Sequence, residues 1–416
     1  MITGIIAEYN PFHNGHLYQI NKVRELYGHD TGIVACISGG LTQRGETPIL
    51  DKWQRAALAV ENGVNLVLEL PAIFAGRSAQ HFAFGGVSLL HKLGVVDRLV
   101  FSTEYPDIEQ LSKAASIDID LYRAELQFMM KQGQSYASAL PQVMSRITGI
   151  DVDIFKEPNT ILGIEYIKAL KHLSSSMEPV AIQRIGTSHT DTEIANGFAS
   201  GTAIRELMTN AAETDTSAGI SQEIRERLQS VVPEATYNKL ISLSPSDFNR
   251  LYPTLQLKLL NSRPKELAEI YSMNEGMEYK LMEAATAPTM TEFVDSLLSK
   301  RYQRSRINRL VNYILLDLTK DLVAEAERTG VTYGRVLAFD DRGREIMKEI
   351  KKVSALPLVT KVSQYINQRD FINKYLTTPL QRQLHVDIQY NNLYELGQQK
   401  PQLNKDFVTS PFYYSR

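Results

Sequence analysis

The sequence predicts an α/β protein with a doubly wound parallel sheet in residues 1–240, followed by a mainly α-helical domain in residues 241–416. In the first hundred residues, short runs rich in Ile, Val and Leu alternate with helical patterns, which is typical of strands buried on both faces of a parallel sheet. Beyond about residue 220, apolar and charged residues mix at helical spacing, as in residues 307–322 and 344–353. A chain of 416 residues also exceeds one typical domain of about 100–200 residues.

The expected elements alternate along the chain. Strands are predicted at residues 4–8, 32–38, 66–70, 98–102 and 179–185. Helices are predicted at residues 15–27, 51–62, 79–93, 159–170 and 203–207, and residues 108–172 are mostly helical. This alternation predicts right-handed βαβ units. The domain boundary is expected near residue 240, with a linker at residues 242–246.

Composition narrows the class of protein. The chain is 43% hydrophobic and 22% charged, which is ordinary for a globular protein. We expect no membrane span, since no apolar run approaches the roughly 20 residues required, and no signal peptide. The single cysteine, Cys36, is expected in a buried strand, which suits a reducing cytoplasm. The formal charge of −2 divides into −7 for residues 1–240 and +5 for the remainder, so the second part is the better candidate for a polyanion partner.

The first candidate site lies where the first strand meets the first helix. His13 and His16 flank Gly15 at the start of that helix. Backbone N–H groups at a helix start are unpaired and attract phosphate, and two histidines there can donate hydrogen bonds to phosphate oxygens. The alternative is that these histidines only cap the helix or hold a structural metal. The motif resembles the HxGH signature of the nucleotidyltransferase superfamily.

A second candidate phosphate site opens a later helix. Ser200 and Thr202 can cap the helix, and Arg205 follows on its first turn. An ordinary capped helix with a surface arginine is the alternative, but the superfamily carries a similar S/T-x-x-I-R motif. The KMSKS-like lysine motif of class I aminoacyl-tRNA synthetases is missing, which argues against that class.

Two further segments narrow the family. Residues 38–46 contain S-G-x-x-x-Q-R-G-E, and residues 158–166 contain P-N-x-I-L-G-x-E-Y. Together with E-Y-N-P-F-H-N-G-H and S-x-T-A-I-R, these runs closely resemble the bacterial tRNA(Met) cytidine acetate ligase family over roughly residues 4–207. The resemblance implies an enzyme that activates acetate with ATP as acetyl-adenylate. It also implies transfer of the acetyl group to N4 of the wobble cytidine of elongator methionine tRNA.

The resemblance also implies site residues. ATP contacts are expected at Ile6, Ala7, Glu8, Tyr9, Asn10, Pro11, Phe12, His13, Asn14, Gly15, His16, Leu17, Tyr18, Gln19, Ser102, Asn159, Arg184 and Ile185. Catalytic roles are expected for His13 and His16 at the α-phosphate, and for Thr202 and Arg205 at the leaving pyrophosphate. Mg²⁺ would arrive with ATP, without a metal site of the protein itself. Glu8 and Lys52 are candidates for orienting groups, with no step assigned.

Some positions depart from the family pattern. Ser102 stands where glycine is expected in a loop that contacts nucleotide. Gly40 and Thr47 replace the expected asparagine and proline. A side chain at residue 102 would crowd a backbone contact, whereas the other two changes affect local loop shape.

A basic run in the second half is the candidate tRNA-binding surface. Within this run, we expect tRNA contacts at Arg301, Arg304 and Arg309. The alternative is an ordinary solvated helix face, because acidic residues are interleaved. Two other functions compete with the ligase: a small-molecule adenylyltransferase with an oligomerisation domain, and a non-catalytic nucleotide- or RNA-binding protein. The number of subunits is not predicted.

Overall fold

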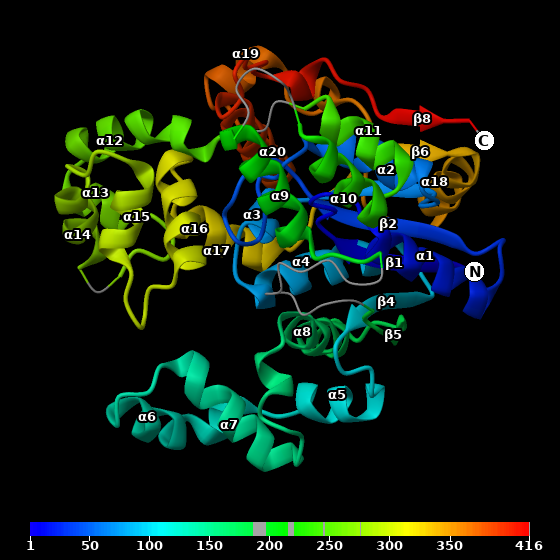
Figure 1. Ribbon diagram of the computed structural model, residues 1–416, viewed down its shortest axis with the longest axis horizontal. Helices are drawn as coiled ribbons and strands as arrows, with labels where there is room; N and C mark the ends of the chain where they lie inside the picture. Colours follow the sequence, from blue (N-terminus) through cyan, green and yellow to red (C-terminus); the bar gives the residue numbers. More distant parts are fainter. Residues whose placement is uncertain (186–196, 215–219, 244–245, 275, 416) are drawn as a thin grey trace.

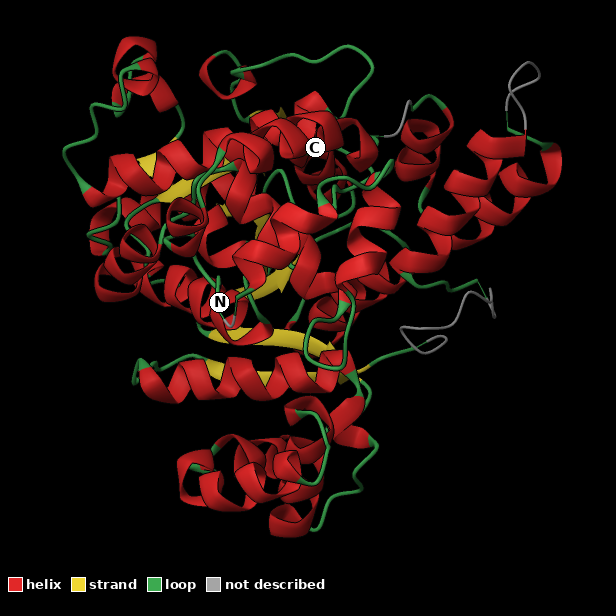
Figure 2. Ribbon diagram, turned by 90° about the vertical axis from the view of Figure 1, so that its left-hand side faces the viewer, coloured by secondary structure: helices red, strands yellow, loops and turns green. Residues whose placement is uncertain are grey.

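The computed structural model describes residues 1–185, 197–214, 220–243, 246–274 and 276–415. Within these ranges one sheet of eight strands forms the centre of the molecule (Figures 1 and 2). The first five strands are β1 (Ile2–Ala7), β2 (Gly32–Ser38), β3 (Leu66–Leu70), β4 (Arg98–Thr103) and β5 (Glu178–Gln183). They lie in the order β5-β4-β1-β2-β3 and are all parallel. The predicted fold class is therefore confirmed.

The chain direction makes the sheet doubly wound. It moves from β1 through α1 (Asn14–Tyr27), β2 and α2 (Lys52–Glu61) to β3. It then returns through α4 (Ala79–Leu93) to place β4 on the other side of β1. Helix α8 (Pro158–His172) leads into β5. The strand order thus reverses between β1 and β4, which is where open α/β sheets bind their ligands.

Both faces of the sheet are apolar, as the sequence predicts. Along β2, Val34 and Cys36 belong to the apolar cluster that includes α4 and α8, whereas Ile33, Ala35 and Ile37 belong to the cluster that includes α1 and α2. All five side chains are fully buried. The alternation follows from the period of two along a strand. Cys36 therefore lies in the core, as expected.

Most expected boundaries are close to those observed. The strands at 32–38 and 66–70 and the helix at 79–93 match, and the other strands are displaced by at most two residues. Asp51 is the N-cap of α2, accepting the N–H of Gln54 with its side chain at 2.7 Å, which explains why the helix begins one residue later than expected. The expected helix at 203–207 is part of the longer α9 (Gly201–Thr214).

Two helical lobes extend from the sheet layer (Figure 1). The first contains α5 (Ile108–Ala115), α6 (Arg123–Lys131) and α7 (Tyr136–Thr148), next to α8. The second contains α12 (Tyr252–Asn261), α13 (Pro264–Ala268), α14 (Met277–Ala284), α15 (Met290–Leu297) and α16 (Arg304–Leu315). Closer to the sheet lie α3 (Ala72–Ala75), α10 (Gln222–Val231), α11 (Glu234–Ile241), α17 (Lys320–Thr329), α18 (Asp341–Val353), α19 (Gln368–Ile372) and α20 (Pro379–Leu396).

The second half of the chain also completes the sheet. Strand β6 (Gly334–Asp340) pairs antiparallel with β3, and both β7 (Leu358–Val359) and β8 (Phe412–Tyr414) pair parallel with β6. These three strands were not predicted from the sequence. The boundary near residue 240 stays a prediction, since the sheet draws strands from both sides of it; of the expected linker, residues 244 and 245 lie outside the described ranges.

Residues 307–322, which have helical spacing throughout in the sequence, do not form one continuous helix. They divide between α16 and α17 because Asp317 takes a left-handed conformation with φ of 52°. Thr319 then caps α17 by accepting the N–H of Leu322 at 3.3 Å.

Among the described residues, the helices lack the length and apolar character needed to cross a membrane.

Candidate active site

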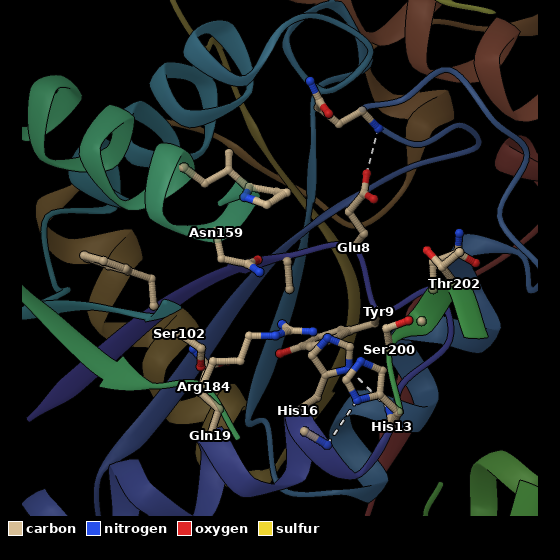
Figure 3. A pocket seen from close by; sticks show the side chains of 18 of the residues that line it. Glu8, Tyr9, His13, His16, Gln19, Ser102, Asn159, Arg184, Ser200 and Thr202 are labelled. Atoms are coloured by element: carbon tan, nitrogen blue, oxygen red, sulfur yellow. Dashed lines mark hydrogen bonds between the residues drawn. The ribbon is translucent and has the colours of Figure 1, made fainter. Parts of the chain in front are cut away.

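A cavity of about 370 Å³ lies at the carboxyl ends of β1 and β4 (Figure 3). Its size falls in the range of roughly 300–1,000 Å³ for small-ligand sites. The end of β1, the start of α1, the loop after β2, the end of β4 and the starts of α8 and α9 all contribute to its wall. It occupies the point where the strand order reverses, so the fold alone marks it as the ligand site.

The two histidines cap α1 and line the cavity at once. His13 Nδ1 accepts the N–H of Gly15 at 3.0 Å, and His16 Nδ1 accepts the N–H of His13 at 3.2 Å. In a neutral imidazole one nitrogen accepts and the other carries the hydrogen, so both rings carry their hydrogen on Nε2. The ring centroids are 3.8 Å apart. Capping is therefore what orients the pair, and it does not compete with a catalytic role.

The protonation state of His16 is set by its surroundings. Burial lowers its pKa well below the usual 6.5, and repulsion from His13, when that ring is protonated, and from Arg184 lowers it further. His16 is thus a neutral N–H donor near pH 7. Such a group can stabilise charge that develops on an oxygen without first losing a proton.

The second motif is joined to the first by direct contacts. Arg205 donates from one guanidinium nitrogen to the carbonyl oxygen of Asn10 at 2.9 Å and from another to Thr202 Oγ1 at 3.2 Å. A Cβ on Gly201 would stand 2.9 Å from the same carbonyl, so glycine allows α9 to start against the turn after β1. Ser200 caps α9 by accepting the N–H of Ala203 at 3.0 Å. These contacts bring all four predicted catalytic residues to one cavity.

The opposite wall is organised by Glu104, which follows β4. Its carboxylate accepts the Asn159 side-chain amide at 2.6 Å and the N–H of Thr160 at 3.0 Å. Arg184 lies 4.0 Å from it, and no described residue accepts a hydrogen bond from the buried Nε of Arg184. Burial lowers the pKa of Arg184, although Glu104 and Glu157 oppose this. A buried guanidinium with a donor that lacks an acceptor favours the binding of an anionic ligand. Ser102, the residue in place of glycine, lies within β4 and not in the expected loop; it is half-buried and also lines this wall.

The loop at residues 39–46, here called the Gln43 loop, forms a further wall. The N–H of Gln43 donates to Glu8 Oε1 at 2.7 Å. Helix α16 supports the loop from outside, because Asn312 Nδ2 donates to the carbonyl of Gly45 at 2.9 Å and Arg309 donates to that of Gln43 at 3.2 Å. Gly45 has φ of 78°, and a Cβ there would come within 2.6 Å of the Arg309 nitrogen. Glycine is therefore required by both conformation and space.

Glycine at residue 40 also has a structural reason. A Cβ at this position would come within 2.4 Å of the carbonyl oxygen of Tyr390 on α20. An asparagine there, as the family pattern leads one to expect, would require α20 or the loop to move.

The structure distributes the expected ATP contacts unevenly. Those that line the cavity are Ile6, Ala7, Glu8, Tyr9, Asn10, His13, Gly15, His16, Tyr18, Gln19, Ser102, Asn159, Arg184 and Ile185. The expected contacts that lie outside this lining are Pro11, Phe12, Asn14 and Leu17. Phe12 is fully buried, with its ring centroid 5.0 Å from that of Tyr9. Asn14 donates from its side chain to the carbonyls of Gly197 and Ser230 at 2.9 and 3.0 Å.

Lys52 does not reach the cavity. It belongs to a set of four buried charges, here called the ion cluster: Lys52, Glu69, Arg335 and Asp406. Lys52 Nζ is 2.8 Å from Glu69 and 2.7 Å from Asp406, and its side chain is fully buried. The expectation that it orients groups at the site is therefore replaced by a structural role.

Sequence reasoning missed part of the lining. Glu104 and the side chains of Thr42, Gln43, Arg44 and Glu46 had no assigned role, yet the last four face the cavity. Their position in the sequence could have indicated them. Residue 104 and residues 39–46 directly follow strands of the parallel sheet, where open α/β sheets bind ligands. Among the described residues, no group of three or more His, Cys, Asp or Glu side chains is arranged to hold a metal ion.

Fold and cavity together define a nucleotidyltransferase. The model of the HIGH Nucleotidyl Transferase family matches residues 1–407, and the chain belongs to this family. A tRNA(Met) cytidine acetate ligase of Alkaliphilus metalliredigens is 34% identical over 99% of this chain and 98% of its own length. The corresponding ligase of Clostridium perfringens strain SM101 is 35% identical with the same coverage. Within the superfamily, the chain thus belongs to the tRNA(Met) cytidine acetate ligase family.

Solved structures agree with this assignment. The apo crystal structure of Thermotoga maritima TmcAL superimposes with a TM-score of 0.87 at 30% identity and covers all of both chains. The form of that protein bound with alpha-thio ATP gives a TM-score of 0.86, with the same identity and coverage.

Proposed function

We propose that this enzyme activates acetate with ATP and acetylates N4 of the wobble cytidine in elongator methionine tRNA. The observation that carries the proposal is the single cavity that holds His13, His16, Thr202, Arg205 and Arg184. Two neutral imidazoles with Nε2 hydrogens and two guanidiniums form a donor set suited to a polyphosphate. Membership of the tRNA(Met) cytidine acetate ligase family supports acetate as the acyl donor and methionine tRNA as the acceptor.

In the first step, an acetate oxygen attacks the α-phosphorus of ATP and pyrophosphate leaves. His13 and His16 stabilise the charge on the α-phosphate oxygens through their Nε2 hydrogens, while Thr202 and Arg205 hold the pyrophosphate. Mg²⁺ enters with ATP as part of the substrate, coordinated by phosphate oxygens and water. In the second step, the cytidine amine attacks the acetyl carbon and AMP leaves. Holding the reactants together supplies much of the rate.

The decisive experiment is mass spectrometry of nucleosides from methionine tRNA after incubation with the enzyme, ATP, Mg²⁺ and labelled acetate. Labelled N4-acetylcytidine that requires both ATP and enzyme is the expected result. Pyrophosphate release with an acid but no labelled nucleoside would reject the RNA and favour the small-molecule adenylyltransferase. Absence of both products would reject the enzymatic function.

The proposed RNA surface lies at α16. Arg301 and Arg304 are exposed, and Arg304 pairs with Asp295, whereas the half-buried Arg309 also supports the Gln43 loop. Replacing Arg301 and Arg304 by Glu should therefore weaken tRNA binding and flatten its salt dependence without slowing adenylate formation. Binding is measured by titration at several salt concentrations, with Lys361→Glu as the control for an exposed charge elsewhere. Unchanged affinity of the double variant would reject this surface.

Replacing Arg309 gives a different expectation. Because this residue bonds to the Gln43 carbonyl, Arg309→Glu should slow adenylate formation as well as weaken RNA binding. The comparison separates the exposed arginines from the one that supports the cavity.

A further inference from the structure

Two carboxylates stand in a cavity otherwise provided with anion-binding groups. The carboxylates that line it are Glu8 and Glu46, against Arg44, Arg184 and Arg205 and the two histidines. Glu46 is partly exposed and lies 3.8 Å from Arg205, so its charge has a partner. Glu8 has no ion pair within 4.0 Å among the described residues, and it faces a site that must hold a polyphosphate. A carboxylate there costs affinity for ATP unless it serves another ligand.

The two oxygens of Glu8 differ. Oε1 accepts the N–H of Gln43 at 2.7 Å, which fixes the side chain. Oε2 accepts no hydrogen bond from any described residue. Glu8 lines the cavity, and Figure 3 shows it on the side away from His13 and His16, with its carboxylate pointing toward the Gln43 N–H. The vacant oxygen is therefore an acceptor presented to a ligand that donates, across from the groups assigned to phosphate.

We infer that Glu8 binds the exocyclic amine of the target cytosine through Oε2 and takes its proton during acetyl transfer. This rests on the proposed function. Carboxylates are the natural partners of cytosine N4, which is a donor. That amine is a weak nucleophile because the ring withdraws its lone pair, so acceptance of its hydrogen by a carboxylate assists attack.

The step balances without a further reactant. N4 forms a bond to the acetyl carbon, and the bond from that carbon to the phosphate oxygen breaks. The oxygen keeps the electron pair and leaves as AMP. One N4 proton moves to Glu8 and is later released to water. Burial raises the pKa of Glu8, although the Gln43 N–H and the charges of Arg55 and Arg205 oppose the shift, and this makes the carboxylate a better proton acceptor.

The position of Glu8 is held by more than the Gln43 loop. The fully buried guanidinium of Arg55 donates to the carbonyl of Glu8 at 2.6 Å and to those of Leu50 and Gly39. These bonds tie the end of β1 to the end of β2. The geometry of the carboxylate is thus preorganised by backbone contacts, as a proton acceptor requires.

The experiment measures the two half-reactions separately in the Glu8→Gln variant. This substitution keeps the shape of the side chain and removes its negative charge. Adenylate formation is followed by pyrophosphate release from ATP and acetate without RNA. Transfer is followed in a single turnover, in which enzyme charged with labelled acetate is mixed with methionine tRNA. We expect transfer to fall on the order of 10²-fold or more, the usual range for loss of a general base, and adenylate formation to fall by a much smaller factor. The acidic limb of the transfer rate against pH should also disappear.

The matched control is Glu61→Gln. Burial also raises the pKa of Glu61, but this residue of α2 lies outside the cavity lining. Both half-reactions of the control should match the wild type, and thermal unfolding should show both variants folded.

Each other result overturns a defined part of the inference. Transfer by Glu8→Gln at the wild-type rate, or an equal loss in both half-reactions, would reject the role of Glu8 at the amine; the second result would assign it to the nucleotide. Adenylate formation by the wild type without any acetylated cytidine would reject the proposed function itself, and with it the acceptor.

Discussion

Charged side chains gather at two places along the central sheet, and the two groups differ in how their charges are compensated. In the ion cluster, Lys52 and Arg335 face Glu69 and Asp406, with all four side chains almost fully buried. Burial would raise the pKa of Asp406, but Arg335 and Lys52 hold it below the usual range. In the cavity, by contrast, Glu8 has no ion pair within 4.0 Å among the described residues, and Arg184 lies 4.0 Å from the carboxylate of Glu104.

The difference distinguishes structure from function. Buried charges are costly unless paired, and a fold that pairs them gains a fixed contact between its parts. The ion cluster joins α2 and β3 to β6 and to the short helix η5 (Lys405–Phe407). Charges left without a close partner in a cavity indicate instead a ligand that supplies one. Three variants or conditions test this distinction.

The largest expected effect follows removal of one member of the ion cluster. Lys52→Met leaves Glu69 and Asp406 facing Arg335 alone, so the free energy of unfolding should fall by about 3–5 kcal/mol. Urea unfolding measures it. Arg263→Ala, which removes the exposed pair with Glu266 on α13, is the control and should show no measurable loss. A Lys52→Met protein of wild-type stability would mean that the cluster does not join these elements.

A cavity residue should behave in the opposite way. His16→Ala removes an Nε2 donor, so pyrophosphate release should fall about 10²–10³-fold, as for loss of one oxyanion donor. The fold should survive, because the lost cap involves one N–H at the start of α1. Steady-state kinetics and the unfolding midpoint are measured on the same sample. Normal kinetics in a folded His16→Ala protein would contradict the assigned role.

The smallest expected effect is a pH dependence. The native state holds the pKa of His16 below 6.5, so below about pH 6.5 the unfolded chain binds a proton that the native protein does not. Stability should therefore fall on acidification, by at most about 1.4 kcal/mol per pH unit for this residue. Burial also lowers the pKa of His81 and His385 to about 4, which adds to the same trend.

The contribution of His16 is isolated by comparison. Urea unfolding at pH 7 and pH 5.5 should give a steeper loss for the wild type than for His16→Ala. Equal losses would show that native His16 takes up a proton as readily as the unfolded chain.

The parallel core was predictable because its signals are local. Strands such as β2 and β3 are continuous apolar runs between turns, and a strand that is buried on both faces has no other pattern. Strands β6, β7 and β8 were missed because the last two contain only two and three residues and because β6 lies between helices. The pairing of β6 with β3 joins residues far apart in the sequence, which no local pattern encodes.

In the site, too, the residues with a local sequence signal were predicted and those that depend on distant contacts were not. His13 and His16 were found because a contiguous motif carries them, and the motif predicts that they share one helix start. The contact between Gln43 and Glu8 depends on how a loop packs against α16. Lys52 looked like a candidate for the cavity because its segment is polar, but its partner Asp406 is more than 350 positions away along the chain. Partners of this kind decide whether a charge is available to a ligand.

The antiparallel pairing of β6 has a consequence for dissecting the protein. In the intact chain, β6 satisfies the backbone groups along the outer side of β3. A fragment that ended near residue 240 would leave this edge bare and hydrophobic, ready to pair with a second copy. Asp406, the buried counter-charge of Lys52, would be missing as well. Soluble expression of the nucleotide-binding half by itself should therefore require a designed cap for β3, even though every residue of its cavity would be present.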